Sequence, residues 1–156
     1  MNFLTWLEAS GIGIWVRSSQ IGYPLMIACH AIGMAVMVGL AVGLAMRLLG
    51  LFRGIPYAAL NSFLVIAWLG FAVNLISGTG LFAAQATTYI TDVTFLLKMA
   101  FVVAGVISVA ILQSAVSRHA GDWSSAAPPA GVRLTAAASI AFWVGATVTG
   151  RLIAYL

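Results

Sequence analysis

Charged side chains are what this sequence has least of. Among its 156 residues only 6% are charged, seven of them Lys or Arg and three Asp or Glu, whereas roughly a quarter of an ordinary soluble domain is charged. Hydrophobic residues make up 63% of the chain. Such a composition excludes an ordinary soluble domain, and we expect a single integral membrane domain over residues 1–156.

Acidic residues and cysteine are too sparse for several kinds of chemistry. Glu8, Asp92 and Asp122 lie far apart, so the sequence offers no paired carboxylates. It also lacks zinc-type ligand spacing, a phosphate-binding glycine loop and a nucleophile with its base, which argues against hydrolase and nucleotide chemistry. The single cysteine, Cys29, excludes an intramolecular disulfide. The basic residues are dispersed beside apolar runs, a pattern typical of membrane topology rather than of nucleic-acid binding.

Long uncharged runs are what the sequence has instead. No formal charge occurs between Arg17 and Arg47, or between Arg53 and Asp92. At about 1.5 Å per residue, a helix of this length exceeds the hydrocarbon core of a bilayer, which is about 30 Å thick. The sequence therefore predicts an all-α bundle of four transmembrane helices, over about residues 24–50, 60–84, 93–117 and 132–155.

The segments outside the spans predict how the chain sits in the membrane. Residues 1–20 should form an interfacial helix that lies along the bilayer. Basic residues gather in the loops after the first and third spans, as Arg47, Arg53, Arg118 and Arg133, whereas the opposite ends carry Arg17 and Arg151. By the positive-inside rule, both loops face the cytoplasm and both termini lie outside.

Small or polar residues recur at every third or fourth position in the spans, a spacing that lets helices approach closely in lipid. They are Ala31, Ala35, Gly39 and Gly43 in the first span, Ala67, Gly70, Asn74 and Gly78 in the second, and Ala137, Ala141, Gly145 and Thr149 in the fourth. We expect these stripes to pack against other helices, either of this chain or of a partner subunit.

His30 lies inside the first span, where hydrocarbon is expected, on a stripe with three methionines. The stripe consists of Met26, His30, Met34 and Met37. An imidazole there can ligate haem iron or copper, exchange a proton with a quinol, or donate an ordinary hydrogen bond. Thioethers suit Cu(I), but methionine at helical spacing is also common packing. The other histidine, His119, belongs to the opposite membrane face, which disfavours a bis-histidine haem within the chain.

Two cations are predicted to share the depth of His30, Lys98 in the third span and Arg151 in the fourth. Ionisable groups in hydrocarbon usually face the bundle interior, although long side chains can instead snorkel to the headgroups. We expect at least two of these three groups to turn inward. The expected partners are Asn74 or Ser77 for His30, and Glu8 for Lys98 or Arg151.

A series of short motifs resembles a known group of proteins. The motifs are Glu8-Ala9-Ser10, Arg17-Ser18-Ser19, Tyr23-Pro24, His30, Gly33, Val38-Gly39, Leu97-Lys98, Gly150-Arg151 and Ala154-Tyr155. In these the chain resembles an uncharacterised family of small bacterial four-helix membrane proteins, which implies an inner-membrane bundle and no particular activity. Members often carry Asn and, five residues later, His near the end of the third helix, where this chain has Ser108 and Gln113. At fold level it is also similar to copper-resistance membrane proteins and four-helix b-type cytochromes.

Together these patterns predict a bacterial inner-membrane protein with an outward-facing polar site around His30, in a redox or metal role that involves haem b, copper or quinone. The candidate site residues are His30, Met26, Met34, Met37, Asn74, Lys98 and Arg151. The alternative is an accessory or scaffold subunit that docks on a larger membrane complex or on itself. Solute transport is less favoured, because only Gly78-Thr79-Gly80 could interrupt a span.

Overall fold

The computed structural model describes residues 2–124, 127–153 and 155, and within them the chain is helical, without a strand. The long helices are α3 (Gly22–Leu48), α4 (Leu60–Ala84), α6 (Val93–His119) and α7 (Ala130–Leu152). The short ones are α1 (Phe3–Glu8), α2 (Gly11–Ser18), α5 (Ala86–Tyr89), η1 (Tyr57–Ala59) and η2 (Asp122–Ser124). The four long helices are long and apolar enough to cross a membrane, as the sequence predicts.

The ends of the long helices follow from local chemistry. Helix α4 has the predicted bounds, and the bounds of the other three differ from prediction by at most three residues. Pro24 lies in the first turn of α3, where its missing N–H costs no helical hydrogen bond. Asp92 caps α6, because its carboxylate accepts a hydrogen bond of 2.7 Å from the backbone N–H of Thr94. Helix α4 continues through Gly78 to Gly80, so Gly78-Thr79-Gly80, the one segment that could have interrupted a span, does not do so.

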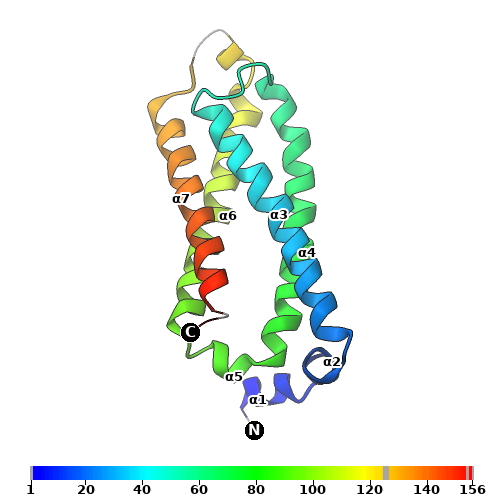
Figure 1. Cartoon of the computed structure of the whole chain (residues 1–156). Helices are drawn as coiled ribbons and strands as arrows, with labels where there is room; N and C mark the ends of the chain where they lie inside the picture. Colours follow the sequence, from blue (N-terminus) through cyan, green and yellow to red (C-terminus); the bar gives the residue numbers. More distant parts are fainter. Residues whose placement is uncertain (1, 125–126, 154, 156) are drawn as a thin grey trace.

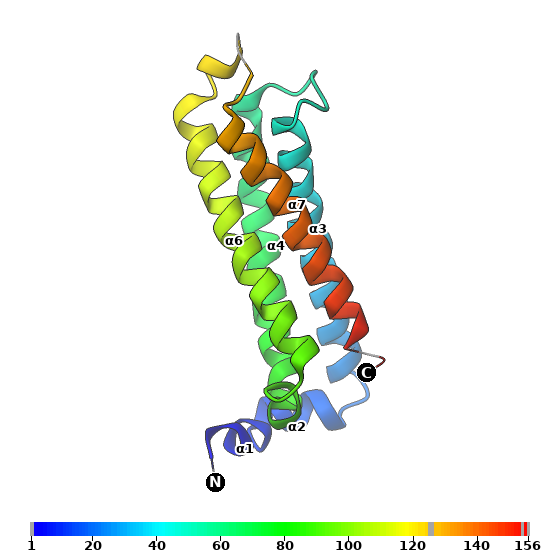
Figure 2. The same cartoon turned by 90° about the vertical axis from the view of Figure 1, so that its left-hand side faces the viewer.

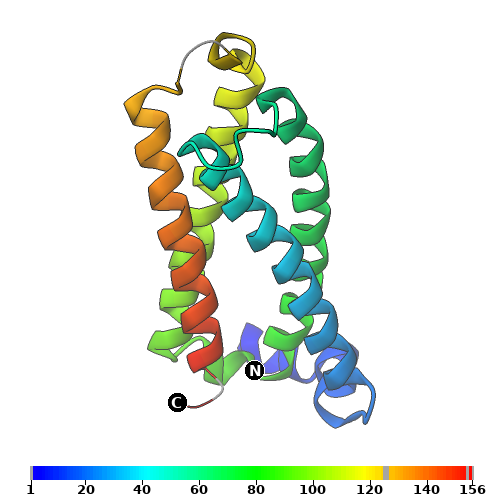
Figure 3. The same cartoon turned by 45° about the horizontal axis from the view of Figure 1, so that its top comes forward.

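The long helices form two antiparallel pairs (Figure 1). Helix α3 packs along α4, and α6 packs along α7. The pairs meet mainly through α3 and α7, whereas α4 and α6 touch little. The two pairs approach most closely at the end that carries η1 and η2, and they separate toward the opposite end (Figure 1, Figure 3).

The N-terminal segment forms two short helices instead of the single helix predicted for residues 1–20. The break falls where Ser10 accepts a hydrogen bond from the backbone N–H of Gly13 and so caps α2. Both helices lie across the end of the bundle (Figure 2). The Glu8 carboxylate accepts hydrogen bonds from the backbone N–H and the hydroxyl of Thr87, at 2.9 and 2.7 Å. The prediction that Glu8 pairs with Lys98 or Arg151 is therefore wrong.

The small-residue stripes differ in what they contact. On α4 the predicted face is confirmed, because Ala67 and Gly70 are buried toward α3. On α3 the prediction is wrong within the chain, since the contact is made instead by Gly33, where an added Cβ would lie 2.7 Å from the backbone oxygen of Gly70. The stripe predicted on α3 faces outward, and an added Cβ at Gly39 would meet nothing within 4 Å.

Candidate functional site

His30 on α3 is held against α4 by two hydrogen bonds that it makes with Asn74. Its Nδ1 lies 3.1 Å from the backbone carbonyl oxygen of Asn74, and Asn74 Nδ2 donates to the backbone carbonyl of His30 at 2.8 Å. The ring fits because Gly78 has no side chain, since a Cβ there would lie 3.0 Å from His30 Cε1. The prediction that Asn74 or Ser77 partners His30 is confirmed, with Ser77 Oγ 3.4 Å from the same Nδ1.

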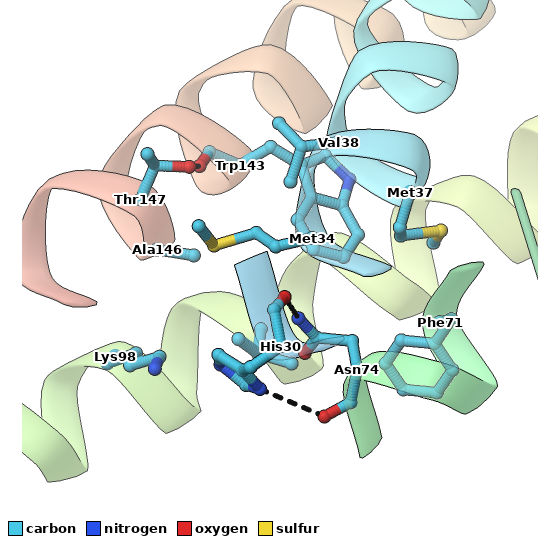
Figure 4. A pocket seen from close by; sticks show the side chains of 11 residues that line it. His30, Met34, Met37, Val38, Phe71, Asn74, Lys98, Trp143, Ala146 and Thr147 are labelled. Atoms are coloured by element: carbon cyan, nitrogen blue, oxygen red, sulfur yellow. Dashed lines mark hydrogen bonds between the residues drawn. The ribbon is translucent and has the colours of Figure 1, made fainter. Parts of the chain in front are cut away.

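This arrangement assigns the two ring nitrogens of His30 different roles. A backbone carbonyl can only accept, so Nδ1 carries the hydrogen and donates it to Asn74. In the neutral imidazole the other nitrogen, Nε2, is then an acceptor with a free lone pair. Figure 4 shows the far edge of the ring turned toward the side chain of Lys98.

Lys98 on α6 is half-buried between the helix pairs and faces the same space as His30. Its side chain lies along Gly150 of α7, where an added Cβ would be 3.2 Å from Lys98 Cε and 3.4 Å from Nζ. Among residues 2–124, 127–153 and 155, no carboxylate pairs with its ammonium group. The site therefore holds one cation and no anion.

A small cavity of about 20 Å³ lies between the pairs at this level (Figure 4). Its polar and sulfur-bearing lining residues are His30, Met34, Met37, Asn74, Lys98, Trp143 and Thr147. A cavity needs roughly 10–15 Å³ to hold one water molecule, so this space admits a single oxygen-sized group. Within the described part of the chain, the indole Nε1 of Trp143 is the one buried side-chain donor without a partner.

The remaining predicted site residues lie elsewhere. Arg151 is exposed, and its Nη2 donates a hydrogen bond to the hydroxyl of Tyr155 at 3.2 Å. Met26 packs against α4, with its sulfur 3.2 Å from where a Cβ of Gly80 would lie. Two of the three predicted ionisable groups, His30 and Lys98, do line the cavity between the helices, whereas Arg151 does not.

The side chains around the cavity offer few ligands for a metal ion or haem. No group of three His, Cys, Asp or Glu side chains gathers anywhere in the described residues. Met34 and Met37 add sulfur donors beside His30, but the Lys98 ammonium would repel a metal cation. Haem is far larger than the 20 Å³ of the cavity. The donor set therefore fits haem and copper poorly.

The positions at which the resembling family often has Asn and His serve packing here. Ser108 on α6 donates to Ser139 Oγ on α7 at 2.9 Å, inside the bundle. Gln113 Oε1 accepts a hydrogen bond of 2.8 Å from the indole N–H of Trp68 on α4. Neither residue lines the cavity at His30, so neither brings a second ligand to it.

Trp143 is the largest of the cavity residues that sequence reasoning missed. It lies on α7, and its ring covers Gly105 of α6, where an added Cβ would be 2.8 Å from Trp143 Cε2. The one signal in the sequence for this contact was Gly105, because a glycine on one helix leaves room for a large ring from another. The partners in such a contact cannot be paired from one sequence.

The chain matches no known protein family, no curated protein and no solved structure with which it was compared.

Proposed function

We propose that this chain is a bacterial inner-membrane protein of a redox system, and that its site at His30 and Lys98 binds a quinol or quinone. Among haem, copper and quinone, the quinone agrees best with the contacts of the site. The observation that carries the proposal is the pairing of an acceptor with a donor across one oxygen-sized cavity, His30 Nε2 on one side and the Lys98 ammonium on the other.

A quinol hydroxyl matches both groups at once. Its hydrogen can be donated to His30 Nε2, and its oxygen can accept a hydrogen bond from Lys98 Nζ. The quinone carbonyl formed on oxidation keeps the contact to Lys98 and loses the one to His30. The site therefore favours the reduced, hydroxyl-bearing form of the head group.

The ring of the ligand has to lie outside the small cavity. Phe71 of α4 and Val102 of α6 line it and offer apolar surface on each side. Because α4 and α6 touch little, the ring can reach the oxygen subsite between these helices. Apolar walls with a few oriented polar groups are typical of small-molecule sites.

Binding of decyl-ubiquinol and decyl-ubiquinone to the purified protein tests the proposal. We expect quinol binding to quench tryptophan fluorescence, since Trp143 borders the cavity. His30→Ala and Lys98→Met should each weaken binding roughly tenfold, the effect of losing one hydrogen bond to a charged or buried group. Arg151→Met is the matched control, because it removes an exposed cation outside the site.

Unchanged quinol affinity in both site variants would overturn the quinol assignment. An absorbance spectrum and metal analysis of protein purified with haem and copper in excess test the rival cofactors. A Soret band or bound copper that disappears in His30→Ala would favour the metal role instead.

We further propose that both termini face outward. Arg47, Arg53, Arg118 and Arg133 belong to the loop end, and Arg17 and Arg151 to the end with the termini. In a Cys29→Ser background, Ala127→Cys should label from the cytoplasm and Tyr155→Cys from outside. Labelling of Ala127→Cys from outside would reverse the orientation.

An accessory role is a second candidate, and the outward stripe on α3 favours it. Ala31, Ala35 and Gly39 are exposed at four-residue spacing, the arrangement by which helices of separate subunits approach in lipid. In a Cys29→Ser background, Ala35→Cys should then crosslink to a second copy or a partner in membranes. Ile107→Cys, exposed on α6, is the control. Equal crosslinking at both positions would indicate random collision.

A further inference from the structure

The end of the bundle opposite the His30 site carries a second, larger pocket of about 580 Å³. It lies between the segment that joins α3 to α4 and the segment that follows α6. The residues that give it its chemistry are Arg47, Arg53, Tyr57 and Trp123. We call it the Arg47 pocket.

Arg47 is held in place by the bundle. Only 8% of it is exposed, and its Nε donates to the backbone carbonyl of Ile55 at 2.6 Å. Its guanidinium stacks on the ring of Tyr57, with Cζ 3.9 Å from the ring centroid. Tyr57 in turn meets Trp123 edge to face, with centroids 5.7 Å apart. The cation is therefore fixed in position before any ligand arrives.

The terminal nitrogens of Arg47 are left for a ligand. Neither has a hydrogen-bond partner among the described residues, yet neither is sealed off as a buried unpaired atom. No carboxylate oxygen within residues 2–124, 127–153 and 155 lies within 4.0 Å of Arg47 or Arg53. A buried guanidinium without a counter-charge favours an anion, and its fork of donors matches a phosphate.

The loop between α3 and α4 brings a second cation to the pocket. Gly50 and Phe52 have positive φ angles, 103° and 51°, and the chain turns back so that Arg53 reaches the pocket. The loop also leaves Leu51 and Phe52 half exposed, at 50% and 55%. Apolar side chains beside a basic pocket with aromatic walls are typical of the membrane interface.

We infer that the Arg47 pocket binds the phosphate of an anionic phospholipid head group, with Arg47 as the buried ligand and Arg53 as the exposed one. The exposed Leu51 and Phe52 favour a lipid over free phosphate, because they place the pocket against the bilayer surface. The inference is independent of the quinol site, which lies at the other end of the helices.

Lipid retention by the full chain tests the inference. The protein is reconstituted in nanodiscs that contain phosphatidylglycerol and phosphatidylcholine, and the lipids it retains are counted by native mass spectrometry. We expect selective retention of phosphatidylglycerol, reduced roughly fivefold by Arg47→Gln and by Arg53→Gln, the effect expected of one basic residue at an anionic surface. Arg133→Gln is the control, an exposed arginine at the same end that does not line the pocket.

Each outcome bears on the assignment. Equal retention of the two lipids by the wild type would overturn it, as would an equal loss in Arg53→Gln and Arg133→Gln. If Arg47→Gln does not fold, the exposed Arg53 still decides the question. Inorganic phosphate is added separately in detergent, and a thermal stabilisation equal to that by phosphatidylglycerol would assign the pocket to free phosphate and refute the lipid.

Discussion

The two halves of the helix bundle are held together differently. At the loop end the core consists of large side chains that are at most 1% exposed, namely Leu48, Leu64, Val109, Leu112 and Val116. Toward the termini the buried residues of the long helices are small, such as Ser77, Gly80, Ala83 and Thr149. There the helix pairs separate, and His30 and Lys98 occupy the space between them.

This difference indicates that the two halves of the long helices have different roles. The apolar half supplies the packing contacts that hold the two pairs together. The polar half keeps two hydrogen-bonding groups half-buried, which would be costly inside a dense apolar core. A site for a ligand can therefore exist without weakening the contacts that maintain the bundle.

The largest effect is expected from a change in the apolar half. Leu112→Ala should lower the free energy of unfolding by about 2–5 kcal/mol, because it leaves a cavity in the core. Its neighbour Ile111 is 53% exposed, and Ile111→Ala should change stability little. Unfolding in mixed micelles of increasing SDS content measures both. Equal losses would mean that the apolar half is not the packed core.

The next effect distinguishes two glycines on α3. Gly33→Ala should cost about 1–3 kcal/mol, because the new methyl would collide with the backbone of α4 and force the pair apart. Gly39→Ala should be tolerated, since nothing lies within 4 Å of its Cβ position. The same unfolding measurement applies, and a tolerated Gly33→Ala would contradict the close approach of α3 and α4.

A smaller effect is expected in the polar half. Asn74→Ala removes the hydrogen bond from Asn74 Nδ2 to the His30 carbonyl, which should cost about 0.6 kcal/mol, the usual value for such bonds between membrane helices. Quinol affinity should fall with it, because this bond holds the backbone of α3 that carries the imidazole, whereas the bond from His30 Nδ1 to the backbone carbonyl of residue 74 remains. A loss of several kcal/mol would instead show that this half also stabilises the bundle.

The smallest effect concerns Glu8 of α1, one of the two short helices that lie across the end of the bundle. Hydrogen bonds from the backbone N–H and hydroxyl of Thr87 lower the pKa of Glu8 below its usual 4.5. Because the folded pKa is the lower one, this contribution to stability is complete above pH 4.5 and is lost as pH falls through the folded value. Comparison of the thermal midpoints of wild type and Glu8→Gln across this range should show a pH-dependent gap that closes in acid.

Much of the fold could be predicted from the sequence, because hydrocarbon imposes a simple rule on helix length and polarity. Long apolar runs with few charges predicted the spans, and Asp92 and Pro24 marked helix starts. The N-terminal break was missed because Ser10 and Gly11 interrupt a segment too short for its periodicity to reveal it. Gly33 and Gly39 look alike in sequence, and only the neighbouring helix distinguishes them.

The candidate site was predicted in part for a similar reason. An imidazole inside a span needs a partner, and Asn74 lay at a suitable depth on the next span. Arg151 was misplaced because its side chain is exposed and donates to the hydroxyl of Tyr155 instead of facing the interior. Contacts such as Trp143 on Gly105 depend on which helices are neighbours, and spacing along one helix does not contain that information.

The two hydrogen bonds between His30 and Asn74 tie the imidazole of His30 to helix α4. With the backbones of α3 and α4 in contact at Gly33 and Gly70, these helices form one closely packed unit that carries the acceptor. Lys98 belongs to the other unit, α6 with α7. Any motion that admits a ligand between the units also changes the distance from acceptor to donor. For the quinol proposed above, entry between the pairs and the placing of His30 Nε2 and Lys98 Nζ around its hydroxyl would depend on the same spacing, so protein with and without quinol should differ in the separation of the two pairs.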